Sequence, residues 1–350
     1  YNSGSVYDVD LLTLETRGEE RFGGGVDTAL NAHGKVDVRT GEYINYGYAY
    51  FQPWLTYYVI APDGTLRHKA RIDLPGPRLP HATTITPRFT ILHDFPLFHD
   101  TAVLRRTGHR VVQFRRDLPS RFGVIPRYGT QEQVKWFEFE PGYVLHMVNA
   151  WEDGDWITMD GCFQPDPTIR RNPEEGALGS MLAYLRYKGH LRRWRMNVVT
   201  GEKSEQQLDD LNVEFCLPDL DLYGVKSRYS YHQLIPTDLQ TLAFEVLVKY
   251  DHDKATREVY HYPRGWFPSE TAFARSTRAT QEDHGYCVTL ATNISDHRSE
   301  AWIFDAQDIT AGPITRIAIP GRVPVGLHAS WCYGRDLWSA AADRRVSHAA

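Results

Sequence analysis

Histidine is the commonest metal ligand among the side chains, because its neutral ring presents a nitrogen lone pair at physiological pH. The chain has 15 histidines, and most histidines in any protein lie on the surface or in the core with no ion nearby. Four differ from the rest because each lies in or beside a strand-like run, next to small or turn-forming residues that let the backbone approach an ion. These four are His33, His81, His146 and His328.

Four neutral imidazoles suit Fe(II), Zn(II) or Cu(II), and geometry and metal availability decide between these ions. The charge of the ion would remain uncompensated, so carboxylates should accept hydrogen bonds from the outer ring N–H groups. We expect Glu214 and Glu270 in that role, although each could otherwise be interpreted as an exposed acid at a strand end.

Strands must position these residues. Short runs rich in Tyr, Val, Ile, Phe and Thr alternate with turn pairs such as Asp63-Gly64, which is typical of an all-β protein. The innermost strands of a propeller face one axis, so histidines distant in the sequence can converge there. A large sandwich is the alternative. The runs that we expect to be strands are residues 57–61, 89–93, 111–114, 134–139, 156–160, 243–250, 286–290 and 301–304.

The spacing of the four histidines fits a propeller. If one blade takes roughly 45 to 65 residues, the first three lie on successive blades and the fourth lies about three blades further along. The main helical pattern covers residues 173–187, with proline in its first turn and leucines on one face. We expect this helix to pack across one face of the propeller; the alternative is an apolar lip that touches lipid or a greasy substrate.

Composition excludes several classes of protein. With 39 basic and 44 acidic residues, a net charge of −5 and no basic run, the chain should have no nucleic-acid partner. No apolar run reaches the roughly 18 residues of a membrane span. The four cysteines lie far apart without a C-x-x-C pair, which argues against a cysteine zinc site or a disulfide framework. Their spacing favours a reducing, cytoplasmic location, with peripheral membrane contact left open.

Three segments carry a resemblance to a known family. Residues 31–42 contain A-H-G-K-V-D and T-G-E, residues 146–152 read H-M-V-N-A-W-E, and residues 322–328 read R-V-P-V-G-L-H. They resemble the motifs A-H-P-K-x-D-x-x-T-G-E, H-x-x-N-A-Y/W-E and R-V-P-x-G-F-H of the carotenoid cleavage oxygenase family. That family includes apocarotenoid and lignostilbene oxygenases and the visual-cycle retinoid isomerase. Residues 117–127 and 282–286 also resemble family segments, so the similarity runs along the whole chain.

Two histidines compete for the second ligand position. His93 carries the letters H-D-F of the family motif, whereas His81 carries the histidine and the I-T at the family separation. His81 also gives intervals to the neighbouring ligands that are near those of the family, and His93 does not. We therefore predict that His81 is the ligand.

The beginning of the chain departs from the family pattern. Asn2 stands where the resemblance places a third glutamate; its carbonyl oxygen could accept an N–H bond but brings no negative charge. The chain begins with Tyr1 rather than Met, inside a strand-like run. We expect one propeller oxygenase domain over residues 1–350 whose natural N-terminal part is missing.

The resemblance implies a seven-bladed β-propeller with iron on its axis and with loops and a helix capping one face. It also implies an enzyme that uses Fe(2+) and O2, without an organic cofactor, to cleave a carbon–carbon double bond of an apolar carotenoid or apocarotenoid. A stilbene is the alternative substrate. A retinoid-type isomerase and a non-catalytic propeller are the alternative functions.

Overall fold

The computed structural model describes residues 3–237, 242–335 and 337–338. Within them, all sheets are antiparallel, and every range predicted as a strand overlaps an observed strand. The predicted turn pair Asp63-Gly64 forms a turn between two strands. In this turn, Gly64 has a φ of 82°, and the Asp63 carboxylate accepts hydrogen bonds from the backbone N–H and the hydroxyl of Thr65. The prediction of an all-β protein is confirmed for the described residues.

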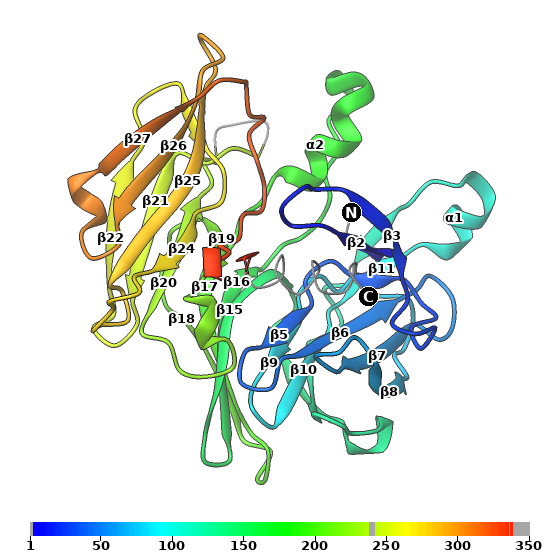
Figure 1. Ribbon diagram of the computed structural model, residues 1–350. Helices are drawn as coiled ribbons and strands as arrows, with labels where there is room; N and C mark the ends of the chain where they lie inside the picture. Colours follow the sequence, from blue (N-terminus) through cyan, green and yellow to red (C-terminus); the bar gives the residue numbers. More distant parts are fainter. Residues whose placement is uncertain (1–2, 238–241, 336, 339–350) are drawn as a thin grey trace.

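Five large sheets contain most of the strands (Figure 1). Sheet one is β5 (Lys35–Asp37), β6 (Glu42–Tyr48), β7 (Leu55–Ile60) and β8 (Leu66–Ile72). Sheet two is β9 (Thr84–Ile85), β10 (Phe89–Asp94), β13 (Ser120–Pro126) and β14 (Lys135–Phe139). Sheet three is β15 (Tyr143–Asp153), β16 (Trp156–Gln164), β17 (His190–Asn197) and β18 (Lys203–Gln207).

The remaining two large sheets follow in the sequence. Sheet four is β19 (Val213–Leu217), β20 (Tyr229–Leu234), β21 (Val246–Asp251) and β22 (Thr256–His261). In sheet five, β23 (Trp266–Pro268) and β24 (Ala272–Arg275) both pair with β25 (Gly285–Asn293), which continues to β26 (Ser299–Asp305) and β27 (Pro313–Ile319). Three two-stranded sheets complete the strands: β1 (Ser3–Gly4) with β4 (Leu30–Asn31), β2 (Val6–Val9) with β3 (Thr16–Glu20), and β11 (Leu97–His99) with β12 (Val112–Phe114).

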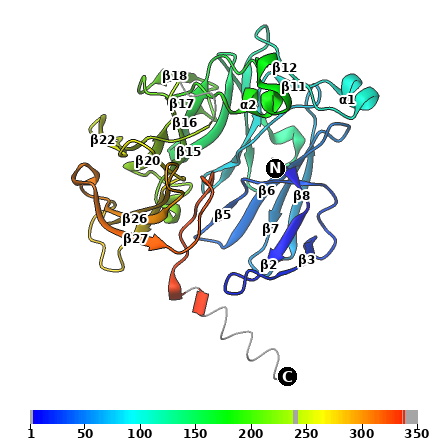
Figure 2. The ribbon, with the colours of Figure 1, turned by 90° about the horizontal axis from the view of Figure 1, so that it is seen from above.

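The large sheets follow one another in an arc, from the blue sheet one to the orange sheet five (Figure 2). Separate apolar cores lie between neighbours: Ile44 and Ile125 belong to the core of sheets one and two, and Phe122 and Trp194 to that of sheets two and three. The first strands of the sheets contact each other in turn, β5 with β9, β9 with β15 and β15 with β19. These first strands therefore form the inner side of the arc, as the propeller prediction requires.

Helices are few and short. They are α1 (Thr101–Thr107), α2 (Gly179–Leu185) and the 3-10 turns Gln131–Gln133, Pro173–Leu178, Leu220–Leu222 and Ile309–Ala311. The prediction of one continuous helix over residues 173–187 is wrong. Gly176 has a φ of 59°, outside the helical region, and interrupts the 3-10 segment that precedes the seven residues of α2. Among the described residues, no helix combines the length and the apolar character that a membrane crossing needs.

Candidate metal centre

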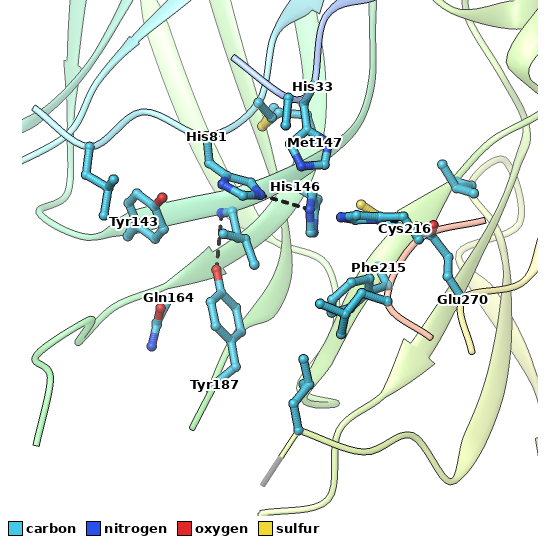
Figure 3. A pocket seen from close by; sticks show the side chains of 18 of the residues that line it. His33, His81, Tyr143, His146, Met147, Gln164, Tyr187, Phe215, Cys216 and Glu270 are labelled. Atoms are coloured by element: carbon cyan, nitrogen blue, oxygen red, sulfur yellow. Dashed lines mark hydrogen bonds and ion pairs between the residues drawn. The ribbon is translucent and has the colours of Figure 1, made fainter. Parts of the chain in front are cut away.

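The inner strands deliver three of the four predicted histidines to one place (Figure 3). His33 immediately precedes sheet one and forms a parallel bridge with Ala82, the residue after His81. That bridge holds the starts of the first two sheets side by side. His146 lies within β15. His328 belongs to the segment that follows β27, so the chain returns from the outer edge of sheet five to supply it.

The geometry of the cluster is that of convergent ligands. One nitrogen from each of the four rings lies within 4.8 Å of the others. The ring centroid of His33 lies 4.4 Å from that of His81 and 4.8 Å from that of His146. Nε2 of His81 is 3.2 Å from Nε2 of His146. Two nitrogens bound to one ion at about 2.1 Å and at a right angle would be about 3 Å apart, so this pair fits a shared ion.

The protonation states also fit a metal. Burial, reinforced by the charge of the neighbouring rings, lowers the pKa of His33 and His81 well below the ordinary value. Burial lowers the pKa of His146 to about 3. These rings are therefore neutral at pH 7, and neutral rings donate lone pairs. Lone pairs gathered at one point repel each other unless a proton or a cation lies between them.

Two carboxylates lie behind the rings. Oε2 of Glu214 is 2.6 Å from Nδ1 of His146, and Oε2 of Glu270 is 3.1 Å from Nδ1 of His328. In both histidines Nδ1 is thereby the donor, and Nε2 is left to face the cluster. Nδ1 of His81 is buried without a hydrogen-bond partner among the described residues. Asn2, the third predicted residue of this kind, lies outside the described residues.

The backbone of β19 is shaped around this contact. Phe215 has a φ of 53°, and the register with β20 shifts between Glu214 and Leu217. The bulge allows Glu214 to accept from the backbone N–H groups of both His146 and Phe215, at 3.2 and 2.7 Å. It also places the Phe215 ring against His146 and His328, with centroids 5.0 and 5.2 Å apart. Burial raises the pKa of Glu214 to about 8.

The cluster opens into a cavity of about 790 Å³, a size that encloses a small organic molecule. Its wall is mostly apolar and includes residues of α2 and of the segment after it, such as Ala183 and Tyr187. The Tyr143 hydroxyl is buried without a hydrogen-bond partner among the described residues. Sequence reasoning missed Tyr143, Tyr187 and Phe215; for Tyr143 and Phe215, the only signal was proximity in the sequence to His146 and Glu214.

His93 lies elsewhere. It is fully buried in β10, where Nε2 is 3.2 Å from the Thr84 hydroxyl and the ring packs against Phe95 and Phe122. The structure therefore brings His81, and not His93, to the other three histidines.

Comparisons with known proteins match one family over almost the whole chain. Residues 1–333 match the family described as retinal pigment epithelial membrane protein. A carotenoid 9,10(9',10')-cleavage dioxygenase from Crocus sativus is 29% identical over 329 residues, covering 90% of this chain. An isoeugenol monooxygenase from Pseudomonas nitroreducens is 27% identical, covering 94% of this chain and 71% of that protein. The chain spans 60% of the length of the Crocus enzyme.

A solved structure shares the fold. Pseudomonas brassicacearum lignostilbene dioxygenase matches with a TM-score of 0.84 and 26% identity, covering 95% of this chain and 72% of that one. This likeness supports the propeller-type fold. The described residues contain five blade-like sheets, so the count of seven blades stays a prediction.

Proposed function

The chain belongs to the retinal pigment epithelial membrane protein family, and from this membership we propose that it is a non-haem Fe(II) oxygenase that cleaves a carbon–carbon double bond with O2. One observation carries the proposal. Four imidazoles, from three inner strands or their starts and from the segment after β27, converge at the end of an apolar cavity.

Each group of side chains has a distinct part in this proposal. His33, His81, His146 and His328 would hold the ion, while Glu214 and Glu270 fix the orientation of two of the rings. When bound, ferrous iron would supply the reaction of O2 with an alkene that yields two carbonyl products. The cavity wall excludes water and holds the substrate beside the rings through apolar contacts. The site needs no organic cofactor.

We propose a carotenoid or an apocarotenoid as the substrate. The mostly apolar wall suits a polyene, and the Crocus relative is named as a carotenoid-cleaving enzyme. A stilbene is the second candidate, because the unpaired Tyr143 hydroxyl in the wall could bind a phenol, and solved relatives include a lignostilbene dioxygenase. Such substrates reside in lipid or on its surface. We therefore also propose peripheral membrane contact near α2, which lines the cavity and exposes Tyr184.

The test is aerobic incubation of the iron-loaded protein, under 18O2, with an apocarotenal and separately with resveratrol. The proposal predicts cleaved aldehydes that carry the label, and the productive substrate identifies the class. An isomerised apocarotenal without label would instead support the isomerase. If fully iron-loaded protein converts none of these compounds, the non-catalytic propeller is the better description.

A further inference from the structure

A second group of metal-binding side chains lies between sheets three and four. Cys162 is on β16, Cys216 on β19 and His232 on β20, and one ligand atom from each lies within 4.8 Å of the others. All three residues are buried. Sγ of Cys162 is 3.9 Å from Nδ1 of His232. The three residues are separate from the four histidines, and the proposed function does not use them.

A hydrogen-bonded chain sets the tautomer of His232. The Ser230 hydroxyl is 2.8 Å from Nε2 of both His232 and His252, and its single hydrogen can be donated to only one of them. Oδ2 of Asp160 lies 3.6 Å from Nδ1 of His252, which favours the proton on that nitrogen. Nε2 of His252 then accepts from Ser230, so Nε2 of His232 donates to Ser230. The bare Nδ1 lone pair of His232 consequently faces the two sulfurs.

We propose that Cys162, Cys216 and His232 form a metal site for a thiophilic divalent ion such as Zn2+. Two thiolates and one imidazole match the preference of this ion. Binding releases one proton from each thiol, and the two thiolate charges then balance the +2 of the ion. The buried complex is therefore neutral, whereas a monovalent ion would leave a buried negative charge.

The observed distance of 3.9 Å between Sγ of Cys162 and Nδ1 of His232 would need to shorten slightly to fit this ion. Metal–ligand bonds of about 2.3 Å to sulfur and about 2.0 Å to nitrogen in a tetrahedral arrangement place sulfur and nitrogen about 3.5 Å apart. Cys216 lines the main cavity, so the ion has a route of entry (Figure 3). The bound ion would connect β16 to β19 and β20 across the boundary between two sheets. Cys216 is also two residues from Glu214, on the bulged strand that supports His146.

The experiment measures cadmium binding to the iron-loaded protein through the ultraviolet sulfur-to-cadmium charge-transfer band. Imidazoles give no such band, so binding at the four histidines does not interfere. All variants carry Cys332→Ser, because Cys332 is the exposed cysteine among the described residues. We expect one cadmium per chain in this parent. Cys162→Ser, Cys216→Ser and His232→Asn should each weaken binding at least 10-fold, whereas Cys287→Ser, at a buried cysteine in sheet five, should leave it unchanged.

A second measurement needs no substitution in the site. Mass mapping after alkylation should show that Cd2+ protects Cys216 in the parent protein, while Cys287 reacts equally with and without the ion. A parent without the charge-transfer band, a band that survives both cysteine substitutions, or alkylation of Cys216 that ignores Cd2+ would each overturn the proposal. The cluster would then be a thiol–imidazole hydrogen bond. Alkene cleavage is measured separately, so its presence or absence does not affect these outcomes.

Discussion

His146 has the densest set of contacts in the candidate metal centre. Its Nδ1 contacts Glu214, its Nε2 faces His81, and its ring packs against Phe215. His328 also has a carboxylate behind it and Phe215 beside it, but its side chain is exposed, whereas that of His146 is buried. Removing His146 would therefore take away a ligand and also leave Glu214 buried without its partner.

We expect His146→Ala to abolish iron binding. His93→Ala is the matched control, because His93 is also a fully buried histidine but lies outside the cluster. Metal analysis of the folded, monodisperse fraction should show no iron for the first variant and normal iron for the second. The opposite pattern would reverse the choice between His81 and His93.

Glu214→Gln should weaken iron retention by roughly 10- to 100-fold, the usual range for residues that orient metal ligands. The amide keeps the size of the side chain but removes the carboxyl group that Nδ1 of His146 contacts, and with it the negative charge that a bound cation would stabilise. Competition with a chelator measures the effect. Glu258→Gln, on β22 of the same sheet, should retain iron like the parent. Equal retention in both variants would remove Glu214 from the site.

At the residue scale, the sequence predicted the four histidines and the two carboxylates behind them, but not the aromatic side chains of the cavity or the second cluster. His33, His146 and His328 lie in segments that resemble family motifs, and His81 was chosen from its spacing. Cys162, Cys216 and His232 escaped notice because their sequence spacing matches no zinc motif; the pairing of sheets three and four brings them together. The cadmium experiment therefore also tests the prediction, made from cysteine spacing, that no cysteine zinc site exists.

At the scale of elements, Asn149 connects two sheets. Its amide nitrogen donates to the carbonyl oxygens of Leu222 and Val225, and its amide oxygen accepts from the backbone N–H of Gly224. These bonds hold the loop between β19 and β20 against β15, the strand that carries His146. In the sequence, Asn149 is part of a segment that resembles a family motif. The sequence did not predict that its side chain holds a loop of the next sheet.

Asn149→Asp should lower the free energy of unfolding by at least about 3 kcal/mol, because a carboxylate would face two carbonyl oxygens in a buried position. Asn293→Asp should be nearly neutral, since the hydrogen bond of Asn293 to the Ser295 N–H uses only the oxygen. Urea unfolding of the two variants provides the comparison. Similar losses in both would show that the amide donors of Asn149 contribute little.

The sequence predicted strands better than helices for a physical reason. Short apolar runs bounded by turn residues determine strands locally. The apolar pattern of residues 173–187 predicts one helix, but the backbone leaves the helical conformation at Gly176, where φ is 59°. The bulge at Phe215 was also beyond prediction, because it results from packing around Glu214 and His146 rather than from the intrinsic preference of phenylalanine.

At the scale of the whole molecule, buried ion pairs join sheets one and two. The Arg127 guanidinium donates to Asp37, Glu42 and the carbonyl oxygen of Thr86. Both carboxylates are buried. Arg127 follows β13 in sheet two, while Asp37 and Glu42 belong to sheet one.

Arg127→Met should therefore cost about 3 kcal/mol of unfolding free energy, the scale of a broken buried pair. Arg88→Met removes an exposed arginine that pairs with Glu152 and should cost less than about 1 kcal/mol. Chemical denaturation of both variants at neutral pH measures the difference. Comparable costs would mean that the contact between the two sheets does not depend on Arg127.

The same carboxylates should make stability fall in acid. Burial by itself would raise the pKa of Glu42, but hydrogen bonds from Tyr128 and Arg67 outweigh it and hold the pKa below its ordinary value. Such a group stabilises the fold above its unfolded pKa, about 4.3, and the contribution is lost as the pH falls toward the folded pKa. We expect the unfolding free energy to decline below about pH 4, and to decline less steeply in Glu42→Gln. Identical slopes would contradict this.

The return of the chain after β27 has a consequence for biosynthesis. His33 lies near one end of the described chain and His328 near the other, so the fourth ligand leaves the ribosome only after all five large sheets have been made. A nascent chain can offer an incoming ion at most three of these imidazoles. In the proposed metal centre, full coordination would close a loop that contains most of the described residues, so metal acquisition would be a late event that reports the folding of the last sheet.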